Sequence, residues 1–252
     1  MNIILLIAYT IPFSLAGLAV YITNEMKCSS DFWTLGHRFE DKRLQMAANF
    51  IGEYMYYLVH LEFPCVADLS MCLLINSCSI YLQEFMKNVK DIHLSHLLAR
   101  SIVVQHDYSI IEENIRNLKE ILSIPLLISL LNGLFNLFLV LTTLLKYGVT
   151  QCKMIELMTR AFIGIVNIVP LVICSSKIPE NMMKIKETFG LLIEKHQLHF
   201  RHKGKGFSIL KRIERKNEIY LSAYGMIDFK RSFLLTAFGS LLTYGLLVSN
   251  LD

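Results

Sequence analysis

Charged residues are scarce in this sequence. Only 18% of its 252 residues are Asp, Glu, Lys or Arg, against about 25% in an average soluble domain, and 54% are hydrophobic. The alternation with period two that is typical of membrane β-barrels is also missing. A water-soluble fold with this composition would leave much apolar surface uncovered. The composition therefore predicts an integral membrane protein whose main partner is the lipid bilayer.

Motifs for nucleotide binding and hydrolysis are also missing. No Walker loop and no G-x-G-x-x-G, G-x-S-x-G or H-E-x-x-H pattern occurs. The N-P-x-x-Y and D-R-Y signatures of G-protein-coupled receptors are absent too. We therefore expect that the protein is not an enzyme, and we expect no cofactor and no nucleic-acid partner.

Long hydrophobic runs are present instead. A helix needs about 20 apolar residues to cross about 30 Å of hydrocarbon, and five runs are near that length. They cover residues 3–21, 54–82, 121–145, 157–174 and 233–251. The sequence therefore predicts an all-α fold, a polytopic transmembrane helix bundle with about five spans in a single domain over residues 1–252.

Basic residues are distributed unequally between the connecting segments. Residues 83–120 and 176–231 hold eighteen of the 25 Lys and Arg residues, whereas 23–52 and 146–156 hold six. Under the positive-inside rule the richer segments are cytoplasmic, so five spans give a cytoplasmic amino terminus and an extracellular carboxyl terminus. A cleaved signal peptide over residues 1–19 is the alternative for the first run, but no Lys or Arg precedes it.

The two basic segments carry a helical pattern of apolar residues. In 176–231 these residues are spaced by three or four positions, which places them on one helix face. They are Ile178, Met182, Ile185, Phe189 and Leu192. A weaker pattern of the same spacing in 83–120 continues into the third span. We therefore expect cytoplasmic helical regions at about 83–120 and 176–231, with a flexible break between His199 and Phe207.

Histidines and cysteines are the candidates for a metal site and for a disulfide. His196, His199 and His202 are three residues apart, but lysines surround them and oppose cation binding, so we expect no metal site. Cys28 and Cys152 both fall in segments assigned to the outside, where a disulfide between them and two free thiols both remain open. The other four cysteines lie in or beside spans, where thiols behave as small hydrophobic side chains.

Polar side chains inside the predicted spans are candidates for function, because a charge at that depth costs at least about 2.5 kcal/mol. Glu62 and Asp68, together with His60, line an aqueous cavity or ligand pocket in one interpretation. In the other, this long helix extends out of the membrane into the cytoplasm, and Asp68 is buried there against protein. Three amides in the third and fourth spans are suited to hydrogen bonds between helices, as structural contacts or in ligand recognition. They are Asn132, Asn136 and Asn167.

The most specific pattern lies in residues 220–251. Residues 221–235 are Leu-Ser-Ala-Tyr-Gly-Met-Ile-Asp-Phe-Lys-Arg-Ser-Phe-Leu-Leu, and residues 243–251 are Thr-Tyr-Gly-Leu-Leu-Val-Ser-Asn-Leu. This pattern resembles the carboxyl-terminal signature of arthropod, insect-type gustatory receptors, in which the final span bears Thr-Tyr, five mostly apolar residues and Gln-Phe. The matching positions are Gly225, Arg231, Thr243 and Tyr244. Asn250 and Leu251 stand where Gln and Phe are usual.

The resemblance implies a multi-pass taste receptor of the plasma membrane, related to the seven-helix fold of insect odorant and gustatory receptors. The chain corresponds to the last five of those helices, so we expect a fragment, a truncated gene model or a short isoform that lacks two amino-terminal helices. Such receptors assemble as homo- or hetero-tetramers with other gustatory receptor subunits. They form ligand-gated, non-selective cation channels whose final helix lines the pore.

The resemblance also implies roles for individual residues. Pore-lining positions would be Thr243, Tyr244, Ser249 and Asn250. A pocket for a small-molecule tastant would include Tyr54, Tyr57, His60, Phe138 and Thr142. Aromatic residues at this depth are equally typical of a belt at the membrane interface. The alternatives to a chemoreceptor channel are a multi-span membrane transporter and a non-functional truncated receptor.

Overall fold

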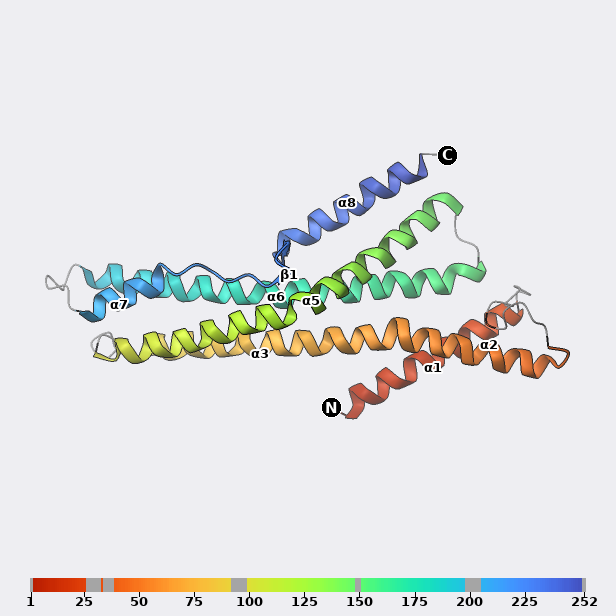
Figure 1. Ribbon diagram of the computed structural model, residues 1–252, viewed down its shortest axis with the longest axis horizontal. Coiled ribbons are helices and arrows are strands. Elements are labelled where there is room, and N and C mark those ends of the chain that lie inside the picture. The colour runs from red at the N-terminus through yellow and green to blue at the C-terminus, as the bar shows by residue number, and fades with distance from the viewer. Residues whose placement is uncertain are drawn as a thin grey trace. The chain divides into compact units, whose positions relative to one another are not determined.

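The fold is all-α, as the sequence predicted (Figure 1). A computed structural model describes residues 2–25, 33, 39–91, 99–147, 151–197 and 205–250. The helices are α1 (Asn2–Glu25), α2 (Lys42–Tyr57), α3 (Phe63–Asp91), α5 (Ser101–Tyr147), α6 (Gln151–Gln197), α7 (Lys205–Glu214) and α8 (Arg231–Ser249). A π-helical turn, η1 (Leu58–Glu62), joins α2 to α3. Strands β1 (Ser222–Ala223) and β2 (Ile227–Asp228) form an antiparallel hairpin.

Four helices in the described part of the chain are long and apolar enough to cross a membrane. They are Lys42–Asp91, Ser101–Lys146, Met154–Glu194 and Arg231–Val248. These helices contain most of the second to fifth hydrophobic runs, so the protein is a multi-pass helical membrane protein by the length and composition of its helices. The first predicted span lies on α1, whose described side chains form a shorter apolar helix, Thr10–Asn24. That span stays a prediction.

The predicted helical extensions beyond the apolar runs are present in part, because residues 215–230, which were expected to be helical, form a turn, an extended segment and the β1–β2 hairpin. α5 begins at Ser101, well before its apolar run, and α6 continues to Gln197. On α6 the predicted apolar stripe is confirmed, because Ile178, Met182, Ile185 and Phe189 are buried and Leu192 is half-buried. Lys184 and Glu187 between them are exposed. Most of the break expected between His199 and Phe207 lies outside the described residues.

Two compact units make up the chain. Unit 1 comprises Met1–Leu69, Leu131–Ile168 and Ala237–Asp252, and unit 2 comprises Ser70–Leu130 and Val169–Thr236. Helices α3, α5, α6 and α8 each contribute residues to both units.

Close helix packing in unit 1 depends on small residues. Where α5 meets α6, a Cβ atom on Gly133 would lie 2.6 Å from Cγ1 of Ile168, and one on Gly164 would lie 2.5 Å from Cγ of Leu137. Side chains larger than hydrogen would therefore force the two helices apart. Elsewhere in unit 1, α1 packs against α2 through an edge contact between the rings of Phe13 and Phe50, with centroids 5.2 Å apart.

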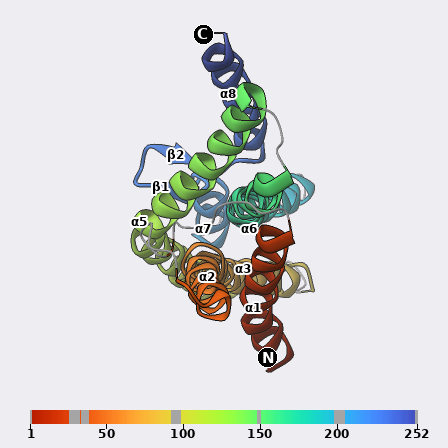
Figure 2. The same cartoon turned by 90° about the vertical axis from the view of Figure 1, so that its right-hand side faces the viewer.

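Unit 2 has an apolar core that is crossed by a buried hydrogen bond between α3 and α6. The largest fully buried side chains of this unit are Tyr108, Phe189, Phe229, Ile75, Leu82 and Ile115. Asn181 on α6 donates through Nδ2 to Oγ of Ser79 on α3 at 2.8 Å. Figure 2 shows the β1–β2 hairpin of this unit projecting beside α5. The backbone N–H of Tyr224 in that hairpin donates to the carbonyl of Ser123 on α5 at 3.2 Å.

Candidate functional site

Helix α8 carries a row of hydroxyl groups on one face. Ser232, Thr236, Ser240 and Thr243 are three or four residues apart, a spacing that places them on the same side of a helix, and all four are exposed. The residues between them are Phe, Leu, Ala and Gly. The hydroxyls of Thr236 and Thr243 donate to carbonyls one turn earlier, at 3.3 Å and 2.9 Å. Their protons are thus satisfied, and their oxygens still have lone pairs for an outside partner. We call these four residues the hydroxyl row.

The opposite face of α8 packs within unit 1. Ala237 and Gly245 on this face are buried. A Cβ atom on Gly245 would lie 2.3 Å from Cδ2 of Leu141 on α5, whereas one on Gly239, beside the hydroxyl row, would meet nothing within 4 Å. Within the described part of the chain, the hydroxyl row therefore lies on exposed surface of α8, and so do the apolar side chains of Leu235, Leu242 and Leu246 on another face of the helix.

The predicted pore-lining residues divide between this face and its edge. Thr243 belongs to the hydroxyl row, and Tyr244, 63% exposed, lies about 100° further around the helix. Asn250 is exposed directly after α8, and the side chain of Ser249 lies outside the described residues. Sequence reasoning missed Ser232, Thr236 and Ser240, although their spacing was visible in the sequence.

A chain of side-chain amides is buried in unit 1. Asn136 Nδ2 donates to Asn132 Oδ1 at 3.1 Å. With the Asn167 amide oriented to satisfy its neighbours, Asn132 donates to Asn167 Oδ1 at 3.0 Å, and Asn167 donates to Asp68 Oδ2 at 3.1 Å. Asn167 is 0% and Asp68 4% exposed. These hydrogen bonds join α5, α6 and α3, as was predicted for the three amides. Asp68 is buried against protein, which agrees with the second interpretation of this residue.

The predicted pocket residues do not form one cluster, and they lie in different environments within unit 1. Tyr54 on α2 stacks on Phe50, with centroids 6.4 Å apart, and its ring edge meets Phe13. Phe138 and Thr142 on α5 are half-buried, and the Thr142 hydroxyl donates to the Phe138 carbonyl at 2.9 Å. The Thr142 hydroxyl proton is therefore used within its own helix.

Tyr57 and His60, by contrast, both contact the ring of Tyr56, a residue that was not predicted to belong to a site. The ring of Tyr56 lies 5.4 Å from that of buried Tyr57 and 4.7 Å from that of exposed His60, measured between centroids. The Arg160 guanidinium lies 6.0 Å from the Tyr56 centroid, and its Nη2 pairs with Glu156 Oε1 at 2.9 Å. The π-helical turn that contains His60 is the kind of irregularity often found at functional sites.

Two further residues extend this aromatic group. Trp33 lies 6.2 Å from Tyr56 between ring centroids, and its Nε1 donates to Glu53 Oε1 at 2.9 Å. Flat aromatic faces beside an arginine and a carboxylate are the features that bind small polar molecules, because the rings supply contact area and the charged groups supply directed hydrogen bonds. We call Trp33, Glu53, Tyr56, His60 and Arg160 the aromatic–ionic group.

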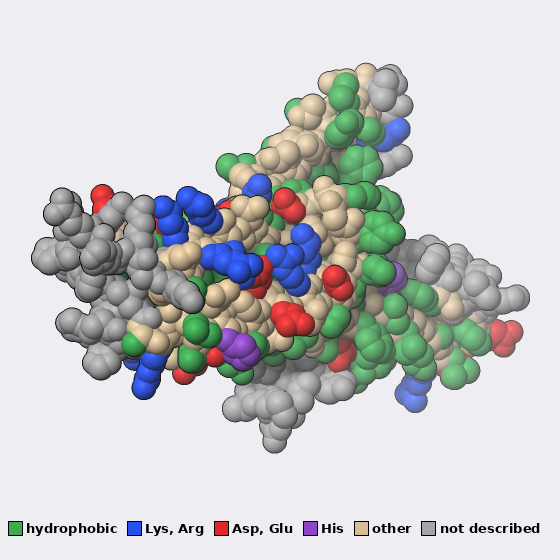
Figure 3. Space-filling view, turned by 60° about the vertical axis from the view of Figure 1, so that its left-hand side comes forward, with side chains coloured by type: hydrophobic (Ala, Val, Ile, Leu, Met, Phe, Trp, Pro, Cys, Tyr) green, Lys and Arg blue, Asp and Glu red, His purple; other side chains and the backbone are tan. Residues whose placement is uncertain are grey.

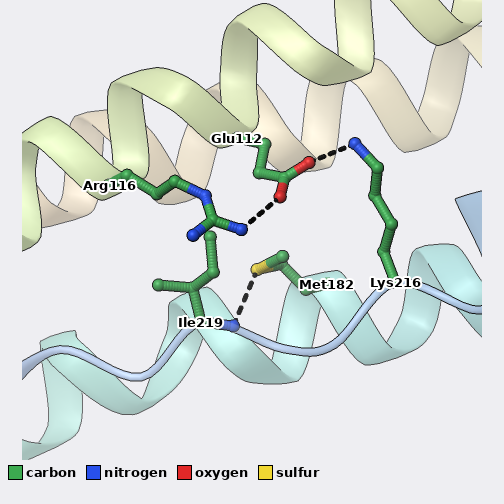
Figure 4. A network of polar contacts seen from close by, with 5 residues as sticks. All are labelled: Glu112, Arg116, Met182, Lys216 and Ile219. Carbon is green, nitrogen blue, oxygen red and sulfur yellow. Dashed lines mark hydrogen bonds and ion pairs between the residues drawn. The ribbon is translucent and has the colours of Figure 1, made fainter.

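Unit 2 contains a network of ion pairs that holds the segment after α7 against two helices (Figure 4). Glu112 on α5 accepts from Lys216 and, at 2.7 Å, from Arg116. The next residues are held by α6, because Lys186 pairs with Glu218 and the Ile219 N–H donates to Sδ of Met182 at 3.5 Å. Basic and acidic side chains accordingly lie next to one another on the face shown in Figure 3.

Electrostatics at the end of this network favour the ionised form of one carboxyl group. The ammonium of Lys186 donates to Glu218, and this hydrogen bond lowers the pKa of the Glu218 carboxyl below its ordinary value. Downstream, Arg231 Nε pairs with Glu180 Oε1 at 2.8 Å, at the start of α8. The ion pairs therefore fix both ends of the segment that leads from α7 into α8.

Several predicted sites fall on residues whose side chains the structure does not describe. These are the histidines His196, His199 and His202 and the cysteines Cys28 and Cys152. Among the described residues, no group of three or more His, Cys, Asp or Glu side chains is placed to hold a metal ion. Glu62 is half-buried, and its Oε2 is enclosed without a hydrogen-bond partner in the described part of the chain.

No protein-family model matches the sequence, and no curated protein matches it. The resemblance to gustatory receptors therefore rests on the sequence alone and stays a prediction.

Proposed function

We propose that the protein is a gustatory receptor-like chemoreceptor, a subunit of a ligand-gated, non-selective cation channel for tastant detection in the plasma membrane. The observation that carries the proposal is the hydroxyl row on α8. It lies on a helix apolar enough to span a membrane, opposite the face by which α8 packs on its own chain.

Lipid is a poor environment for such a row. Hydrocarbon offers no hydrogen-bond partners, so polar groups in spans face a water-filled cavity or another helix. In a tetramer, four copies of α8 turned toward a common axis bring their hydroxyl rows to a shared path. Hydroxyl oxygens there replace part of the hydration shell of a passing cation. Thr243 contributes directly, with Tyr244 and Asn250 beside the path.

A small-molecule tastant is the ligand that the aromatic–ionic group suits. Tyr56 and Trp33 supply ring faces for the apolar side of a sugar or bitter compound, and Glu53 and Arg160 supply an acceptor and a donor. His60 is exposed beside Tyr56 and adds a further polar group. Binding at this group would be transmitted along the α3, α5 and α6 helices that the buried amide chain joins.

Unit 2 has the features of an anchor for the channel. Its ion pairs and its buried α6 stripe hold the segment that precedes α8, so movement of the pore helix is restrained at that end. The excess of basic residues in 176–231 favours a cytoplasmic location for the polar part of this unit under the positive-inside rule. The end of α8 that follows Thr243 then faces the extracellular side.

The proposal is tested by expressing the chain in cells and recording currents during application of a tastant panel. Cation currents evoked by a tastant are expected. Tyr56→Ala should shift the concentration for half-maximal response because it removes the centre of the aromatic–ionic group, while Met55→Ala, an exposed neighbour on the same helix, should leave the response unchanged. Surface labelling establishes that the chain is at the plasma membrane. Absence of any evoked current from chain at the surface contradicts the proposal.

A further inference from the structure

The hairpin before α8 has a tight turn with an unusual residue at its tip. β1 and β2 pair with Ser222 opposite Asp228 and Ala223 opposite Ile227. Tyr224, Gly225 and Met226 connect them, and the Met226 N–H donates to the Ala223 carbonyl at 2.9 Å. Tyr224 and Gly225 are the two central residues of this turn, and their φ values of 50° and 70° lie in the left-handed region. Glycine and asparagine adopt this conformation at low cost, whereas a bulky residue such as Tyr does so rarely.

Burial changes abruptly along this hairpin. Leu221, Ala223 and Phe229 at its base are at most 1% exposed, and Phe229 donates its backbone N–H to the Leu221 carbonyl at 3.0 Å. At the tip, Tyr224 is 61% and Met226 69% exposed. A rigid base therefore presents two large side chains outward, and neither is needed for the core of unit 2.

The hairpin is placed at the level where the helices of unit 2 become apolar. The Tyr224 N–H bonds to the carbonyl of Ser123 at 3.2 Å, close to the start of the uncharged run of α5. Arg231 at the start of α8 bonds through Nε to Ser176 Oγ at 3.4 Å, directly after the apolar run of α6. These contacts mark the boundary between the polar and apolar parts of the unit.

Three exposed isoleucines on α5 lie at the start of its apolar run, at the depth of the hairpin. Ile121 is 72%, Ile124 56% and Ile128 63% exposed, and their spacing of three and four residues places them on one side of the helix. Ile121 and Ile124 lie within two residues of Ser123, so they stand at the depth at which the hairpin is bonded, on a different side of the helix. Exposed apolar surface on a membrane-spanning helix is covered by lipid, so the hairpin tip lies at the depth where lipid begins to cover α5.

We propose that Tyr224 and Met226 insert into the lipid boundary and anchor the hairpin at the membrane surface. Tyrosine is enriched at this depth because its ring is apolar and its hydroxyl reaches the headgroups. Lys230, whose ammonium lies 4.6 Å from the Tyr220 ring centroid, is exposed next to the hairpin and meets lipid phosphates. Lipid is favoured over a second copy of the chain because the tip lies at the depth where the exposed apolar surface of a span begins. The inference does not depend on the channel proposal.

Fluorescence quenching by brominated lipids tests this anchor. Tyr224→Trp is made in a chain that also carries Trp33→Phe, which removes the natural tryptophan, and the full chain is reconstituted in phosphatidylcholine–phosphatidylglycerol vesicles. Bromine near the glycerol end of the acyl chains should cause a larger loss of fluorescence than bromine at the chain ends. Emission should shift to the blue, and aqueous iodide should quench weakly. Met226→Trp provides the same measurement at the second tip residue.

The matched control is Leu191→Trp in the same background. Leu191 is also apolar and 67% exposed, but it lies on α6 well beyond the apolar run. Its fluorescence should not respond to brominated lipid. Quenching of both tip tryptophans by iodide and not by lipid would place the tip in water and overturn the inference. Shielding from both quenchers would show that a second copy covers the tip, and would overturn it as well.

Discussion

Gly245 of α8 faces Leu141 of α5 with no room for a side chain, since a Cβ atom on Gly245 would lie 2.3 Å from Leu141 Cδ2. This contact fixes which side of α8 packs on its own chain. The hydroxyl row is turned to the other side, where Gly239 has open space. The rotation of α8 about its axis, and with it the direction in which the hydroxyl row faces, therefore follows from the packing at one glycine.

Gly245→Ala and Gly239→Ala form a matched pair for this packing. Both substitutions gain the same helix propensity, about 1 kcal/mol in a helix interior, so their difference reports the packing. Gly245→Ala should lower the free energy of unfolding by about 1–3 kcal/mol relative to Gly239→Ala, because the added methyl overpacks the contact with Leu141. Unfolding of the purified chain by titration with SDS measures the difference. Equal stability of the two variants would mean that α8 packs through another face.

The buried amide chain is tested at its central member. Asn167→Ala removes the donor to Asp68 and the acceptor for Asn132, and we expect a loss of about 1–2 kcal/mol of unfolding free energy. Asn114→Ala, an exposed position on α5, should change it by less than about 0.5 kcal/mol. The same SDS titration compares them. If Asn167→Ala were as stable as Asn114→Ala, the hydrogen bonds to Asn167 would contribute nothing to the packing of α3, α5 and α6.

Acid should weaken unit 2 through Glu218. Because its pKa is lowered in the folded protein by Lys186, this carboxylate contributes stability that is fully present above its ordinary pKa of 4.5. That contribution is lost as the pH falls through the lowered folded-state pKa. Glu218→Gln should therefore be less stable near neutral pH and should lose less stability on acidification below about pH 4.5 than the wild-type chain.

The control for the acid experiment is Glu187→Gln, an exposed carboxylate on α6. It should keep the wild-type decline in stability with falling pH. The melting temperatures of the three proteins are measured from pH 3 to pH 7, a range that includes the ordinary carboxyl pKa of about 4. A wild-type decline in Glu218→Gln would show that the ion pair with Lys186 does not form.

Single-channel conductance tests the hydroxyl row. Thr243→Val keeps the shape of the side chain and removes the hydroxyl, so it should lower the conductance, because an ion loses a group that replaces its hydration. Leu242→Val, at nearly the same depth but on a different face, should leave the conductance unchanged. Equal conductances for Thr243→Val and the wild-type chain would exclude Thr243 from the ion path.

Periodicity predicted much of the fold. The spacing of Ile178, Met182, Ile185 and Phe189 identified the buried stripe of α6 because a helix face is a local property of the sequence. The four apolar helices were also predictable, since length and composition determine whether a helix can cross a membrane. The hydroxyl row of α8 could have been predicted in the same way, because its four residues recur at intervals of three or four positions.

Features that depend on tertiary packing could not be predicted in the same way. Asp68 lies on α3 and Asn167 on α6, and their contact depends on how these two helices pack against each other. The hairpin was missed because its turn has Tyr224 where Asn or Asp would have given a recognisable turn signal. The aromatic–ionic group brings Trp33 to Tyr56 from a separate segment, which no spacing rule anticipates.

Cysteine accessibility along α8 tests the central claim most directly. Thr243→Cys and Leu242→Cys place thiols at nearly the same depth, on the hydroxyl row and away from it, and both positions are exposed in the single chain. A charged, membrane-impermeant thiol reagent is applied to intact cells, with the unsubstituted chain as the background for native cysteines. We predict that Thr243→Cys reacts and Leu242→Cys does not, because water reaches only the hydroxyl row. Protection of Thr243→Cys, or equal reaction at both positions, would contradict the account.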